Sequence, residues 1–132
     1  MIRQDIRLEA EQWDITVFYA VTHYEMDEIM KTLIEAGCEG RNLELAYRNL
    51  TAGMMDTGLC FSGKGKSVVV ISVASSARQF MNSMAHELHH LSSHIAKAVG
   101  YDLLGEEVCY MTGEIAERMH TVAGRYLCEC CR

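Results

Sequence analysis

The stretch from Ser76 to Gly100 reads SARQFMNSMAHELHHLSSHIAKAVG and predicts one long helix. Ser76 and Gln79 have the spacing of a capping box, in which the serine caps the first turn of a helix. Neither glycine nor proline occurs from Ala77 to Val99. Gly100 then stands where a left-handed C-terminal cap is expected. We therefore expect a helix over residues 77–99.

The two sides of this helix differ in chemistry. Five apolar residues recur at helical spacing and form one stripe, which predicts a side packed on a core: Phe80, Met84, Leu88, Leu91 and Ile95. His86 and His90 lie opposite the stripe, and their four-residue spacing places one imidazole above the other. That side is either a solvated polar face or the floor of a cleft.

Residues His86-Glu87-Leu88-His89-His90 have the pattern H-E-x-x-H. Two imidazoles at this spacing can hold one divalent metal, usually zinc, and the adjacent glutamate can take a proton from a water on that metal. This is the core of a zinc-dependent hydrolase, most often a peptidase. We expect His86 and His90 to be metal ligands and Glu87 to be the general base.

Length, composition and charge narrow the class of protein. A chain of 132 residues is long enough for one domain with a real core, and 49% apolar residues argue against disorder. A net charge of −6 without a basic run argues against nucleic-acid binding. Neither a membrane-spanning stretch nor a signal-peptide core is visible, so a cytoplasmic protein is expected. The oligomeric state stays open.

Six cysteines are present, and without a secretion signal they are expected to be free thiols rather than disulfides: Cys38, Cys60, Cys109, Cys128, Cys130 and Cys131. The dense tail Cys128-Glu129-Cys130-Cys131 does not have the C-x-x-C spacing of a zinc knuckle. We expect it to be reduced and frayed.

The remaining chain predicts an α+β protein. Asp14–Val21 is rich in β-branched and aromatic residues and predicts a strand. Leu59–Ser62 and Ser67–Val73 predict two more strands, joined by a hairpin turn over residues 63–66. Helical periodicity predicts three more helices, at Met26–Ala36, Leu43–Met54 and about Gly105–Ala123.

The last helix offers a third metal ligand, since catalytic zinc sites usually have three protein ligands and one open position. Glu106 and Glu117 lie on its polar side with Tyr110 and Gly113, where a glycine allows close helix approach. The first helix continues on the order of 14 Å beyond His90. Glu106 reaches the metal only if the connection folds back or the helices cross steeply, and Glu117 therefore stays a competitor.

These residues resemble the zincin metallopeptidases, within them the gluzincin group, and small zincin-like proteins of bacteria and phages. His86, Glu87 and His90 match the motif position by position, and Glu106-Glu107-Val108-Cys109-Tyr110 resembles the context of the third ligand. The resemblance covers about residues 57–120 of a single zincin-like domain, 1–132. The histidine-rich continuation of the metzincins is absent.

The resemblance implies a fold, a cofactor and a class of substrate. The fold is a small antiparallel-containing sheet packed on the H-E-x-x-H helix, followed by a second helix that carries the glutamate. The cofactor is Zn²⁺, with Glu106 as third ligand, and the substrate is a peptide or protein, bound to an edge strand by β-addition. Tyr110 is the expected oxyanion donor, with His120 and His94 as further candidates.

Two other functions stay open. One is a zincin-like binding or phage-structural module without catalysis. The other is a ferritin-like di-iron bundle, because Glu87-x-x-His90 and Glu117-x-x-His120 are both E-x-x-H pairs and other helices could supply further carboxylates. The candidates for those carboxylates are Glu28, Glu35 and Glu44.

Overall fold

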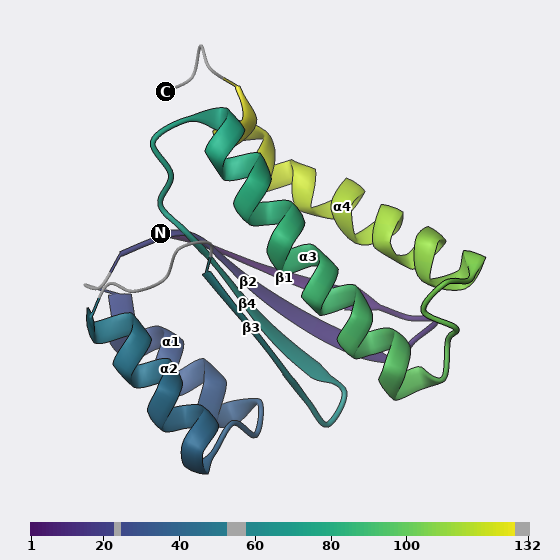
Figure 1. Ribbon diagram of the computed structural model, residues 1–132, viewed down its shortest axis with the longest axis horizontal. Coiled ribbons are helices and arrows are strands. Elements are labelled where there is room, and N and C mark those ends of the chain that lie inside the picture. The colour runs from purple at the N-terminus through teal and green to yellow at the C-terminus, as the bar shows by residue number, and fades with distance from the viewer. Residues whose placement is uncertain (23–24, 53–57, 129–132) are drawn as a thin grey trace.

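The computed structural model describes residues 1–22, 25–52 and 58–128. The described chain is α+β, as predicted, and Figure 1 shows a sheet between two pairs of helices. In chain order the elements are β1 (Ile2–Leu8), β2 (Trp13–Val21), α1 (Met26–Glu35), α2 (Gly40–Ala52), β3 (Gly58–Gly63), β4 (Lys66–Ser72), α3 (Ala77–Val99) and α4 (Glu106–Leu127).

The strands form one mixed sheet in the order β1-β2-β4-β3. β2 and β4 run parallel in the centre, and β1 and β3 are antiparallel strands at the two edges. The expected hairpin joins β3 to β4. Its two turn residues, Lys64 and Gly65, have φ values of 53° and 76°, as a tight turn with two left-handed residues requires.

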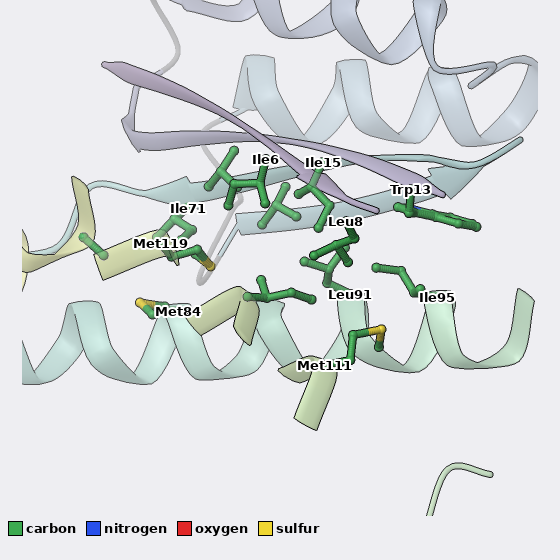
Figure 2. Close-up of a cluster of buried hydrophobic side chains, with 14 of the residues drawn as sticks. Ile6, Leu8, Trp13, Ile15, Ile71, Met84, Leu91, Ile95, Met111 and Met119 are labelled. Carbon is green, nitrogen blue, oxygen red and sulfur yellow. The ribbon is translucent and has the colours of Figure 1, made fainter. Parts of the chain in front are cut away.

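Each face of the sheet is covered by one helix pair. β2 alternates, so that Ile15, Val17 and Tyr19 pack toward α3 and α4 while Phe18 packs toward α1 and α2. The larger core lies under α3 and α4 (Figure 2). The predicted stripe of α3 supplies its share of this core, with Leu88 only partly buried at the margin.

Both ends of α3 are capped by the predicted residues, Ser76 and Gly100. Ser76 Oγ accepts a hydrogen bond from the backbone N–H of Gln79 at 3.1 Å. The Gln79 side chain reaches back one residue further than a capping box requires, and accepts from the Ser75 N–H at 2.7 Å. Gly100 has φ 87° and its N–H bonds to the carbonyl of Ala96.

Strand β1 was not predicted from the sequence. Its residues alternate, with Ile2, Ile6 and Leu8 packed toward the core, but Gln4 interrupts that apolar row. Gln4 is accommodated because its amide donates to the carbonyl of Arg118 at 2.8 Å and accepts from the Tyr19 hydroxyl at 2.6 Å. Because Gln4 breaks the alternation of apolar and polar residues, the sequence pattern does not indicate a strand here.

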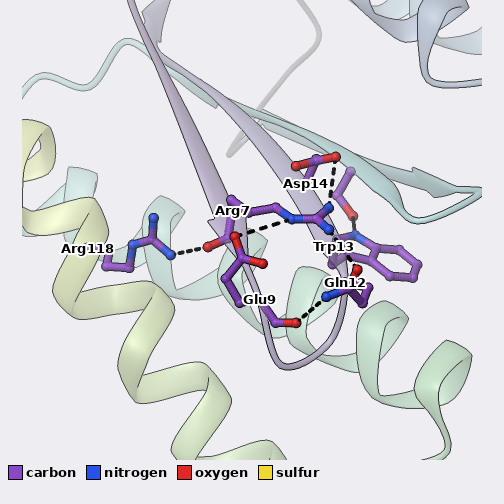
Figure 3. Close-up of polar contacts among 7 residues, drawn as sticks. Arg7, Glu9, Gln12, Trp13, Asp14 and Arg118 are labelled. Carbon is purple, nitrogen blue, oxygen red and sulfur yellow. Dashed lines mark hydrogen bonds and ion pairs between the residues drawn. The ribbon is translucent and has the colours of Figure 1, made fainter.

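Polar contacts also tie the β1–β2 hairpin to α4 (Figure 3). The Arg118 guanidinium donates to the carbonyl of Arg7. Arg7 in turn forms an ion pair with Asp14 at 3.1 Å, and the Gln12 amide donates to the carbonyl of Glu9 at 2.7 Å. These groups lie at the surface, so they set the position of the hairpin more than they add stability.

Two helices differ in extent from the prediction. α2 begins at Gly40 rather than Leu43, and its predicted end at Met54 lies outside the described residues. α4 continues past Ala123 to Leu127. Its last turn is held by Tyr126, whose ring stacks on Phe80 with centroids 4.9 Å apart.

The sheet excludes the ferritin-like bundle. Glu28, Glu35 and Glu44 belong to α1 and α2, which cover the opposite face of the sheet from α3 and α4. They cannot join the E-x-x-H pairs of α3 and α4 in one bundle core.

Within the described ranges, no helix is both long enough and apolar enough to cross a membrane.

We predict that Leu91→Ala lowers the free energy of unfolding by about 2–5 kcal/mol, because Leu91 is 0% exposed under the sheet and its truncation leaves a cavity. Leu104→Ala is the control, since Leu104 is 95% exposed and its loss should change stability by about 0.5 kcal/mol or less. Urea denaturation followed by circular dichroism measures both. Equal losses in the two variants would contradict this core.

Candidate metal centre

Three histidines follow one another along α3 at four-residue spacing, and we call His86, His90 and His94 the histidine row. The ring centroids are 5.0 Å apart between His86 and His90, and 6.2 Å apart between His90 and His94. His86 and His90 are exposed, whereas His94 is half-buried. The row therefore forms on the outer side of α3, as its position opposite the apolar stripe predicts.

Glu87 is buried on the flank of α3 that faces β3. Its side chain is only 2% exposed. The thiol of Cys60 on β3 lies within its electrostatic reach, since burial and then the Glu87 charge raise the pKa of Cys60 to about 12. The carboxylate is thus shielded from bulk water, next to two exposed imidazoles.

His94 ends a chain of hydrogen-bonded side chains that crosses the sheet. The Trp13 indole N–H donates to Ser67 Oγ at 2.8 Å, and Ser67 Oγ lies 2.6 Å from Ser62 Oγ. Ser62 Oγ lies 2.8 Å from His94 Nδ1. Trp13, Ser67, Ser62 and His94 are called the relay below. Burial, followed by the charges of His90 and Lys97, lowers the pKa of His94.

A cavity of 370 Å³ lies beside β3, between α2 and α3. Asn42 and Asn49 of α2 line it on one side, Cys60 and Ser62 of β3 form its wall, and His94 lines it from α3. We call it the β3-edge cavity. Because β3 is an outer strand of the sheet, the cavity adjoins a strand edge that has no neighbouring strand among the described residues.

The structure does not bring Glu106 to the histidine row. α4 runs back along α3 (Figure 1), and the Thr112 hydroxyl lies 2.8 Å from Ser92 Oγ, which aligns these two residues. Glu106 is then about 12 Å from the level of His90 along the helix axes, at 1.5 Å per residue. Glu117 lies on the other side of Thr112, about level with Glu87.

Both carboxylates are exposed on α4. Glu106 and Glu107 occupy the first turn of that helix, where a negative charge stabilises the helix by interacting with the positive end of its dipole. Glu106 therefore has an ordinary structural explanation, and Glu117 is the α4 carboxylate at the level of the H-E-x-x-H motif.

The other predicted site residues on α4 also lie away from the row. Tyr110 is 76% exposed on the outer side of α4, and His120 is exposed about three turns further along. The role expected for Gly113 is wrong, because a side chain there would meet nothing within 4 Å. Of the candidate oxyanion donors, only His94 lies on the same helix side as His86 and His90.

The donor set fits zinc in part. His86 and His90 offer two imidazole nitrogens at the spacing that zinc-binding helices use. In the parts of the chain that the structure describes, no three histidine, cysteine, aspartate or glutamate side chains gather as they would around a metal ion.

Comparisons with protein-family models, with curated proteins and with solved structures found no match.

The relay was not predicted from the sequence. Ser62 and Ser67 pair directly across the β3–β4 hairpin, and each is a polar residue beside an apolar one, Phe61 and Val68. That pairing could have been read from the predicted turn. The contact with Trp13 could not, because it depends on the parallel pairing of β2 with β4.

We predict that Cys109 reacts with iodoacetamide at least on the order of tenfold faster than Cys60 near pH 8. Both are free thiols, as is Cys38, but Cys109 is exposed and Cys60 is partly buried with a pKa near 12. Because the thiolate is the reactive form, Cys60 labelling should rise with every pH step below that pKa. Peptide mass spectrometry measures both rates. Similar rates at both sites would refute the burial of Cys60 beside Glu87.

Proposed function

We propose that the protein is a zinc-dependent hydrolase that cleaves peptides. The observation that carries the proposal is the arrangement of the H-E-x-x-H motif on α3: two exposed imidazoles one helical turn apart, and beside them a buried carboxylate on the flank toward β3. An ordinary solvated helix face does not require a buried glutamate.

Each residue has a separate task in this proposal. His86 and His90 hold the metal through one imidazole nitrogen each. Zinc, when bound, supplies a Lewis acid that makes water more acidic. Glu87 accepts the proton of the attacking water and returns it to the leaving amine. Its burial supports that role, because a site closed to bulk water limits the loss to solvent of a proton that Glu87 has taken from the attacking water.

Two glutamates of α4, Glu106 and Glu117, are candidates for the third protein ligand of the metal. Glu117 is about level with the H-E-x-x-H motif, and Glu106 is about two helical turns away from that level. We therefore place Glu117 ahead of Glu106 as the α4 carboxylate that contributes to metal binding, in contrast to the gluzincin-like spacing. Either carboxylate would have to reach across from α4.

We predict that each chain binds about one zinc ion and that this binding requires His86 and His90 of the histidine row. His90→Ala should lose the zinc, and His89→Ala should keep it, because His89 lines a different surface groove, between α3 and α4. Glu117→Gln should weaken zinc binding more than Glu106→Gln does. Elemental analysis after dialysis against a zinc buffer measures all four variants. Zinc retained undiminished by His90→Ala would exclude this site.

General-base catalysis predicts that Glu87→Gln reduces peptide hydrolysis by at least ~10²-fold while zinc stays bound. The amide keeps the shape of the side chain and removes its basic oxygen. Glu107→Gln is the control, an exposed carboxylate in the first turn of α4. Cleavage of a broad peptide library by zinc-loaded protein measures the rates, and circular dichroism checks the fold. Equal rates for Glu87→Gln and the parent protein would refute the mechanism.

A non-catalytic binding module is the second candidate. It is favoured by the absence of a three-ligand cluster in the described part of the chain. Stoichiometric zinc without cleavage of any library peptide would support it, and cleavage that depends on Glu87 would exclude it.

A further inference from the structure

The two helices that cover the larger core expose groups of opposite charge. The exposed side chains of α3 that can carry a charge are all basic: Arg78, His86, His89, His90 and Lys97. The acidic residue of that helix, Glu87, is buried. On α4 four exposed carboxylates precede one exposed arginine: Glu106, Glu107, Glu114, Glu117 and Arg125. A basic helix surface therefore lies beside an acidic one.

We call the side of α3 and α4 that points away from the sheet the outer face. His86 on α3 and Glu117 on α4 both lie there, opposite the buried stripes of their helices. Side chains on the outer sides of two neighbouring helices point in the same direction and do not converge. Packed helix axes lie about 8–10 Å apart, and a groove of 610 Å³ separates α3 from α4. Glu117 is thus level with the H-E-x-x-H motif without facing the imidazoles of its own chain.

A second copy of the chain can bring a carboxylate to face those imidazoles. When two copies pack symmetrically through their outer faces, the two-fold axis lies between them. An axis that crosses the helices would set α3 on α3 and α4 on α4, with base against base and acid against acid. An axis parallel to the helices sets α3 of each copy on α4 of the other. Only this second arrangement is complementary in charge.

The parallel axis also keeps every residue at its own level along the helices. α3 and α4 are antiparallel (Figure 1), and Ser92 and Thr112 mark one common level. Counted in opposite directions from there, Glu117 falls at the level between His86 and His90. In the pair, the partner's Glu117 therefore faces the two imidazoles from the opposite layer.

A second contact follows from the same alignment. Glu106 is within one residue of the level of Lys97, so in the pair each Lys97 meets the partner's Glu106. At the other end of the helices Arg125 is level with Arg78, and that turn adds no attraction. Charge complementarity is thus concentrated from the H-E-x-x-H motif toward the α3–α4 connection.

We propose that two copies pair through their outer faces about an axis parallel to α3 and α4, and that each zinc site takes His86 and His90 from one copy and Glu117 from the other. For its metal, this dimer rests on the proposed function. Three protein ligands leave one position for water, as in catalytic zinc sites. The symmetry of the pair gives two such sites.

Sedimentation equilibrium at micromolar protein measures the pair directly. We expect a dimer with equimolar zinc and a dimer at least about tenfold weaker in EDTA, because a metal held by both chains stabilises their association. Lys97→Glu should weaken the dimer about tenfold, and the double variant Lys97→Glu with Glu106→Lys should restore it, since the charges are exchanged. A monomer that holds one zinc, or equal association of Lys97→Glu and the parent, would overturn this pair.

Mixing two variants distinguishes a ligand of the partner from a ligand of the same chain. His90→Ala and Glu117→Gln each have a defect in every site. A mixed pair has one complete site, with both histidines from the Glu117→Gln chain and the glutamate from the His90→Ala chain. Zinc retained after dialysis should rise to about one per four chains for random pairing, and toward about one per two as zinc favours the mixed pair.

The control mixture combines His86→Ala with His90→Ala, because neither chain then offers both histidines. It should retain no more zinc than the separate variants do. Circular dichroism checks that these exposed substitutions leave the fold intact. No gain of zinc in the His90→Ala and Glu117→Gln mixture would overturn the shared site.

The outcomes separate the dimer from the hydrolase. A zinc-bearing monomer that cleaves peptides would overturn the dimer and leave the hydrolase standing. A zinc-linked dimer that cleaves no peptide would support the shared site and count against the hydrolase alone. A parent protein that binds no zinc would overturn both.

Discussion

Burial of one side of α3 against the sheet is the constraint on which the rest of the structure depends. Leu91 and Ile95 are fully buried in the core that α3 and α4 form with the sheet, and once that side is fixed, the opposite side has to carry His86 and His90. The flanks follow in the same way. One flank meets α4 at Ser92, and the other presents Glu87 to β3. The candidate site therefore sits where it does because of apolar packing, not because of contacts among its own polar groups.

Most of the fold could be predicted because its signals are local. The bounds of α3 follow from Ser76 and Gly100, and the β3–β4 turn follows from its glycines, since caps and tight turns act within a few residues. What could not be predicted depends on partners far along the chain. β1 carries Gln4 in its inward row, and that residue makes sense only beside Tyr19 and Arg118.

In the candidate site too, the residues of one helix could be predicted, whereas those that depend on contacts between elements could not. The spacing of His86, Glu87 and His90 was visible in the sequence because all three lie on one helix. Which residue of α4 stands opposite them is a matter of how two helices are aligned, and no local pattern encodes that. The Ser92–Thr112 contact sets the alignment, and it moves Glu106 away from the motif and Glu117 toward its level. The burial of Glu87 likewise depends on its position beside β3, which the H-E-x-x-H pattern alone does not predict.

The relay has an optical consequence, because Trp13 is the only tryptophan of the chain. Its indole N–H is hydrogen-bonded to Ser67, and through Ser62 it is coupled to the ring of His94. Indole emission depends on the hydrogen bonding and polarity around that nitrogen. The intrinsic fluorescence of the unlabelled protein is therefore a built-in signal from one residue, located at the inner end of the chain of side chains that leads to the β3-edge cavity. Events at that cavity can be followed in real time without attaching a dye.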